Sequence, residues 1–111
     1  MDINMRLENL LICNMDVFTS AEREDHLRAT AELYHSAINI TETENGFEFL
    51  FANKSENILR LAEFISNERL CCQFLEFTLR ISPNGKPISL LLTGPEGTKE
   101  FLQVELHEAF E

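Results

Sequence analysis

Apolar and polar residues alternate along five short segments of the chain, which is the pattern of β-strands with one buried face. The segments span 5–15, 38–44, 47–51, 75–81 and 88–92. Between and after them, apolar residues recur at intervals of three and four, as on one face of a helix. Helices are therefore expected to begin near Thr19, Ser55 and Glu96, which gives the element order βαββαββα.

Local signals mark several boundaries between these elements. Thr19 and Glu22 have the spacing of a capping box, in which two side chains satisfy the first free N–H groups of a helix. The Asn-Gly pair at 45–46 predicts a tight hairpin turn. Ser55 is expected to cap the second helix, and Pro95 is expected in the first turn of the last helix.

The first two predicted helices each present one apolar stripe to a core, whereas the last is apolar around much of its circumference. The stripe of the first helix comprises Leu27, Ala31, Tyr34 and Ile38. The stripe of the second helix comprises Ile58, Leu61, Ala62 and Ile65. Phenylalanines at 47, 49 and 51 share one face of their strand, so we expect them to form the centre of the core.

The first six elements match the split βαβ arrangement of ferredoxin-like domains. We therefore predict one domain over 1–111, an α+β two-layer sandwich with a ferredoxin-like core, an extra strand and a C-terminal helix. The second face of the sheet is more apolar than a solvated face needs, since it carries Leu10, Ile12, Leu50, Phe74 and Leu91. Either a homodimer interface covers such apolar surface, or the last helix folds over part of it.

The chain is strongly acidic, with 9 Lys and Arg against 19 Asp and Glu and a formal net charge of −10. This charge repels phosphate backbones and anionic lipids, so we expect neither nucleic acid nor membrane as a partner. The sequence has no recognisable signal peptide, and its three cysteines are an odd number, which together indicate free thiols in the cytoplasm. The acidic residues of the last helix, Glu105 and Glu108, are expected on a solvated face.

The segment at 68–74 carries most of the chemistry, because it contains two adjacent cysteines. Adjacent cysteines exclude a zinc ribbon, in which two residues separate paired ligands. The predicted topology nevertheless places the end of the first strand, the start of the first helix and the end of the second helix at one end of the domain. Thiols and imidazole select zinc or softer thiophilic ions. The candidate metal ligands are Cys13, His26, Cys71 and Cys72.

Helical geometry, at about 100° per residue, predicts how these side chains face. Cys72 and Arg69 are expected to face the core, with Cys71 on the flank of the helix. Glu22 and His26 lie four residues apart on one helix and are expected to pair. Ion pairs between the two helix ends would then support the site through Glu22, Arg23, Glu68 and Arg69.

Segments 13–26, 64–74 and 92–97 resemble a family of small uncharacterised prokaryotic proteins whose hallmark is E-R-x-C-C-P-F. Similar segments also occur appended to metal-responsive-type transcriptional regulators. The resemblance covers about residues 12–102 and brings no established activity. It implies that one site contains Cys13, Glu22, Arg23, His26, Glu68, Arg69, Cys71 and Cys72. Gln73 stands where the family usually has proline.

Three functions from different classes fit the sequence. The first is a cytoplasmic domain that binds a soft metal ion through thiolates. The second is a thiol–disulfide redox protein, in which Cys13 pairs with Cys71 or Cys72, or the two neighbours form a vicinal bridge. The third is a non-catalytic homodimeric interaction module whose cysteines only pack in the core.

Overall fold

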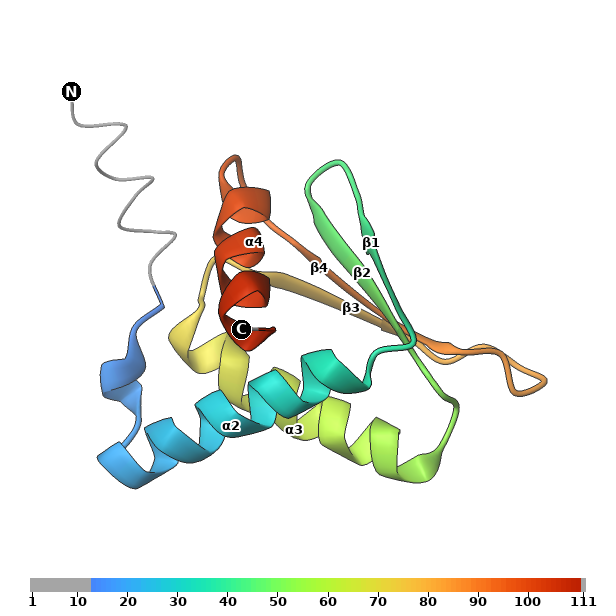
Figure 1. Cartoon of the computed structure of the whole chain (residues 1–111), viewed down its shortest axis with the longest axis horizontal. Coiled ribbons are helices and arrows are strands. Elements are labelled where there is room, and N and C mark those ends of the chain that lie inside the picture. The colour runs from blue at the N-terminus through green and yellow to red at the C-terminus, as the bar shows by residue number, and fades with distance from the viewer. Residues whose placement is uncertain (1–12, 111) are drawn as a thin grey trace.

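A computed structural model describes residues 13–110 and has the expected α+β two-layer architecture (Figure 1). A short 3-10 helix η1 is followed by three helices and four strands. In chain order they are η1 (Met15–Val17), α2 (Ser20–Ser36), β1 (Asn39–Glu42), β2 (Gly46–Phe51), α3 (Ser55–Cys71), β3 (Glu76–Arg80), β4 (Ile88–Thr93) and α4 (Thr98–Ala109). The strands form one antiparallel sheet in the order β1-β2-β4-β3. The predicted α+β sandwich is therefore confirmed.

The core lies between the sheet and the helices. Phe47, Phe49 and Phe51 on β2 pair with alternate residues of β4 and are buried, as the alternation predicts. The hairpin that leads into β2 is also confirmed, since the Thr43 N–H donates to the Gly46 carbonyl at 2.9 Å across the Asn-Gly turn. The helices pack against this face of the sheet.

The predicted starts of the helices are partly confirmed. The Thr19 N–H donates to Glu22 Oε1 at 2.8 Å and the Glu22 N–H donates to Thr19 Oγ1 at 3.2 Å, which completes the capping box of α2. The prediction for Ser55 is wrong, because the cap position of α3 is the residue before it and no side chain bonds there. Pro95 lies outside α4, where its carbonyl accepts the Thr98 hydroxyl at 2.6 Å.

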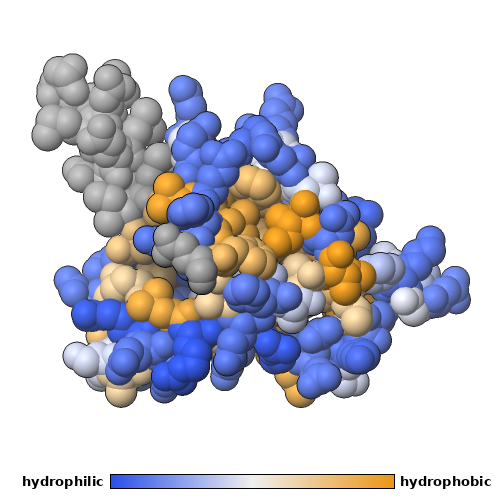
Figure 2. Space-filling model, viewed as in Figure 1, coloured by the Kyte–Doolittle hydropathy of each residue, from blue (hydrophilic) through white to orange (hydrophobic). Residues whose placement is uncertain are grey.

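The inward faces of α2 and α3 differ from the predicted stripes. On α2 the buried residues are His26, Thr30, Leu33 and Tyr34, and on α3 they are Asn57, Leu61, Phe64, Glu68 and Cys71. Leu27 and Ile38 are more than half exposed, and apolar surface is visible on the face of the molecule that carries α2 and α4 (Figure 2). The predicted stripes are confirmed in part, since Tyr34 and Leu61 are buried and Ile58 and Ile65 pack against the core.

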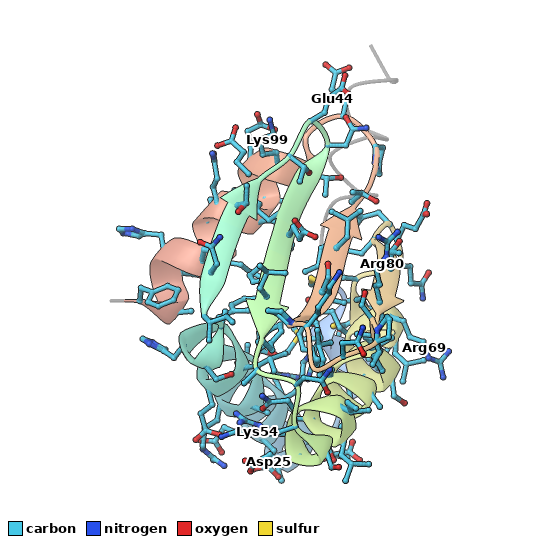
Figure 3. The ribbon with its side chains drawn as sticks, turned by 90° about the vertical axis from the view of Figure 1, so that its right-hand side faces the viewer. Asp25, Glu44, Lys54, Arg69, Arg80 and Lys99 are labelled. Carbon is cyan, nitrogen blue, oxygen red and sulfur yellow. A yellow bond between two sulfur atoms is a disulfide. The ribbon has the colours of Figure 1, made fainter. Side chains whose placement is uncertain are left out.

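The last helix does not cover the second face of the sheet. All three helices lie on one side, and Figure 3 shows the opposite face of the strands in front of them. Phe74 also lies on the helical side, where its ring meets Phe101 of α4 edge-on at 5.0 Å. Leu50 and Leu91 remain on the open face, while Leu10 and Ile12 lie outside the described residues.

The predicted first strand falls mostly on residues that the structure does not describe. Its last residue, Met15, belongs to η1 rather than to a strand. The adjacent Asn14 N–H donates to the Cys71 carbonyl at 2.7 Å, so this segment is attached to the end of α3. None of the described helices has the length and apolarity needed to cross a membrane.

Candidate functional site

The three cysteines meet at the C-terminal end of α3. Cys71 is the last residue of this helix, Cys72 caps it, and the bond from Asn14 to the Cys71 carbonyl brings Cys13 alongside. Cys13 and Cys72 form a disulfide, although they are 59 residues apart in the sequence. The free Cys71 Sγ lies 3.8 Å from the Cys72 Sγ. The convergence of the three cysteines at one end is as predicted, and the Cys13–Cys72 bridge is one of the pairings named for the redox alternative, with Cys71 left as a free thiol.

Helix α3 ends although Gln73 stands at the position where the resemblance leads one to expect proline. The Cys72 N–H donates to the Glu68 carbonyl at 2.8 Å, and the Gln73 side chain donates to the Leu70 carbonyl at 3.4 Å. Cys71 and Cys72 are both buried. Cys72 therefore faces the core as predicted, and the flank of α3 on which Cys71 was expected is buried as well.

A buried histidine–glutamate pair lies next to these sulfurs. His26 Nε2 is 2.7 Å from Glu68 Oε1, and the two side chains are only 4% and 3% exposed. The imidazole lies between the rings of Phe18 and Phe64, at centroid distances of 5.2 and 6.2 Å. The predicted partner of His26 was Glu22, which instead serves the capping box of α2. The pair joins the first turns of α2 to the last turn of α3.

The other residues expected to support the site do not join it. Arg69 is exposed and points away from the domain (Figure 3). Arg23 lies 3.7 Å from Asp16 at the surface. The predicted network across the helix ends is therefore wrong for both arginines and for Glu22. A charged residue at a helix end can pair with several neighbours, and the rotation of each helix about its own axis determines which of them it contacts.

The Glu68 carboxylate also controls the Cys71 thiol. The Cys71 Sγ lies 3.6 Å from Glu68 Oε1, within reach of a weak S–H hydrogen bond. Burial, followed by the negative charge of Glu68, raises the pKa of Cys71 from 9.0 to about 12. The thiol is therefore protonated at neutral pH, and the chain holds it as a neutral group beside a carboxylate.

A pocket of about 330 Å³ opens onto this cluster from the side of α2 and α4, the face seen in Figure 2. Cys13, Cys71 and Glu68 lie along it, together with Glu105 from α4. The Glu68 Oε2 atom is buried and has no hydrogen-bond partner among the described residues. Sulfur-bearing, carboxylate and apolar side chains therefore line the pocket together.

Glu105 was assigned to a solvated face, and that expectation is wrong. The Tyr34 hydroxyl donates to Glu105 Oε1 at 2.9 Å. Burial, with the nearby charge of Glu68, raises the pKa of Glu105 from 4.5 to about 8. No spacing in the sequence connects Glu105 with residues near 70, so only the packing of α4 against α2 brings it to the site.

The ligand atoms of these residues form three overlapping groups whose members all lie within 4.8 Å of one another. The groups are Cys13–Cys71–Cys72, Cys13–Glu68–Cys72–Glu105 and His26–Glu68–Cys71. The predicted ligand set is thus divided, because His26 shares a group with Cys71 but with neither of the other cysteines.

Comparison with protein-family models, curated proteins and solved structures finds no match to this chain. The family resemblance stays a prediction. The site is therefore interpreted from its own geometry.

The half-buried Glu105 should make the stability of the domain depend on pH. Between pH 4.5 and about 8 the folded chain binds a proton that the unfolded chain has lost, so the free energy of unfolding falls as pH rises. In wild type we expect the free energy of unfolding to fall by at least about 2 kcal/mol between pH 5 and pH 8, and in Glu105→Gln we expect this fall to be absent. Urea unfolding at several pH values measures the difference from wild type.

Glu108→Gln is the matched control for this prediction. It removes the same charge one turn along α4, at an exposed position. If the two variants change the pH profile equally, net charge rather than the burial of Glu105 causes the dependence.

Proposed function

We propose that the reduced chain binds a thiophilic metal ion through Cys13, Cys71 and Cys72. The observation that carries this proposal is that the three Sγ atoms all lie within 4.8 Å of one another at the end of one helix. Thiolates prefer Cu(I), zinc and heavier soft ions over hard cations. A single ion would thus draw on residues from two segments that are 59 residues apart.

The surroundings of the sulfurs support this assignment. Cys71 and Cys72 are buried, so water does not compete strongly for an ion bound there. The Glu68 carboxylate offers a further oxygen ligand close to the sulfurs, and its Oε2 atom has no hydrogen-bond partner among the described residues. His26 is expected to orient Glu68 rather than to bind the ion, because its Nε2 already contacts Glu68 Oε1.

The disulfide implies that ion binding depends on redox state. Two of the three sulfurs are bonded to each other in the oxidised chain, so they become ligands only after a thiol reductant supplies two electrons and two protons. The same bridge favours a second candidate function, thiol–disulfide exchange. The two functions differ in Cys71, which the metal site uses as a third sulfur ligand and which exchange at the Cys13–Cys72 bridge does not need.

Native mass spectrometry of the anaerobically reduced chain with one equivalent of zinc or cadmium tests the first proposal. We expect one bound ion in wild type and none in Cys13→Ala or Cys72→Ala. Cys71→Ala should bind more weakly but still measurably, because the group Cys13–Glu68–Cys72–Glu105 remains. Glu22→Gln is the control that should bind like wild type, since Glu22 lies in the capping box.

Two results would overturn the metal proposal. One is a wild-type chain that binds no ion while its thiols titrate freely, with reversible loss of two thiols on oxidation; this favours the redox function. The other is a chain without an ion whose thiols react only after unfolding. That result favours an interaction module with cysteines as packing residues.

A further inference from the structure

The pocket beside the sulfurs is larger than a bare metal ion needs. Its volume is about 330 Å³, and apolar walls come from Met15, Leu27, Phe101 and Val104. Cys13 and Cys71 lie along it, whereas Cys72 does not. An ion held between three sulfur atoms would leave this apolar space unfilled. The space fits a ligand that carries an organic group.

The charges around the pocket restrict the ion as well. Glu68, Glu105 and Glu108 line it, and no Lys or Arg is among the described lining residues. A divalent ion bound by all three thiolates carries a net charge of −1, and a monovalent ion −2. A trivalent ion that keeps one organic group is neutral with only the two thiolates along the pocket, which avoids burying further negative charge near these carboxylates.

Resting on the proposed metal function, we propose that the reduced site binds a trivalent arsenical that carries one apolar organic group. Arsenic would bond to Cys13 and Cys71, and the organic group would fill the pocket between α2 and α4. In this condensation two As–O bonds and two S–H bonds break and two As–S bonds form. The protons leave with the hydroxyl groups as two waters. Arsenic stays trivalent, so no oxidant is consumed.

The test uses phenylarsine oxide as the ligand with an organic group, and arsenite and cadmium as ligands without one. Affinities are measured by calorimetry on the chain reduced with a phosphine. Val104→Trp fills the pocket from a position that is 60% exposed, so the fold should tolerate it. We expect this variant to bind phenylarsine oxide at least tenfold more weakly, with cadmium and arsenite affinities within threefold of wild type.

Two further variants complete the experiment. Leu59→Trp places the same residue on α3, where Leu59 is exposed and does not line the pocket, so it should leave all three affinities unchanged. Cys72→Ala should keep phenylarsine oxide, which needs two thiols, while it loses cadmium.

The outcomes separate this inference from the function on which it rests. Cadmium binding without phenylarsine oxide binding, or an unchanged phenylarsine oxide affinity in Val104→Trp, overturns the arsenical and keeps the metal site. Loss of phenylarsine oxide from Cys72→Ala contradicts the assignment to Cys13 and Cys71. If phenylarsine oxide, arsenite and cadmium all fail to bind, both proposals are overturned.

Discussion

Reduction of the Cys13–Cys72 disulfide should lower the free energy of unfolding by about 4 kcal/mol. The bridge closes a loop between residues 59 apart, and such a loop strongly restricts the unfolded chain. In the folded chain the Cys13 segment is already held by the bond from Asn14 to Cys71 and by η1 against α3. Reduction therefore acts mainly on the unfolded ensemble. Urea unfolding with and without a phosphine reductant measures the loss.

Cysteine variants show whether this bridge is responsible. Cys13→Ala should unfold like the reduced wild type and should no longer respond to the reductant. Cys71→Ala keeps the bridge and should still respond. The prediction fails if reduction leaves the wild-type midpoint unchanged, or if removal of Cys71 alone abolishes the response to reductant.

Ligand binding should partly offset this loss. A ligand at a hundred times its dissociation constant stabilises the folded chain by about 2.7 kcal/mol. A thiophilic ion bound only by the reduced chain would therefore recover more than half of the lost stability. Bonds from the sulfurs to the ion would then link the two segments in place of the disulfide.

Replacement of His26 by leucine should cost about 3–5 kcal/mol at pH 7. The substitution leaves the carboxylate of Glu68 buried with no imidazole beside it, and its second oxygen already has no partner among the described residues. An unpaired charge in such surroundings is far more expensive than the lost contact itself. Chemical denaturation of the oxidised chain measures the effect while the disulfide stays in place.

The double variant His26→Leu Glu68→Leu is the informative comparison. It replaces both charges with apolar side chains and should recover most of the stability. The exposed pair of Asp25 and Arg28 on the same helix serves as a control, and Asp25→Ala there should cost no more than about 0.5 kcal/mol. If the double variant is as unstable as His26→Leu, packing of the imidazole between two phenylalanines matters more than charge.

The strands, the hairpin and the capping box are predictable because each depends on residues close in sequence. Phe47, Phe49 and Phe51 need only alternation to identify a buried face, and Thr19 and Glu22 need only their spacing. The inward faces of α2 and α3 depend on contacts between residues that are far apart in the sequence. The side chain of Glu68 enters the core only because an imidazole from 42 residues away meets it there.

The candidate site also contains residues that the sequence predicts and residues that only tertiary packing brings together. Cys13, Cys71 and Cys72 were predicted to lie at one end of the domain, and they do, although the bond from Asn14 to Cys71 rather than the end of a described strand holds Cys13 there. Glu105 was missed because α4 could pack on either face of the sheet, and the sequence does not choose between them. Once α4 lies beside α2, the Tyr34 hydroxyl reaches Glu105 and the carboxylate becomes part of the pocket.

The last turn of α3 links the sulfurs mechanically to a residue near the start of α2. The Glu68 carbonyl accepts the Cys72 N–H, and the Glu68 carboxylate meets both His26 and the Cys71 thiol. A change in the redox or ligand state of the sulfurs is therefore expected to shift the proton resonances of the His26 imidazole, which contacts them through Glu68.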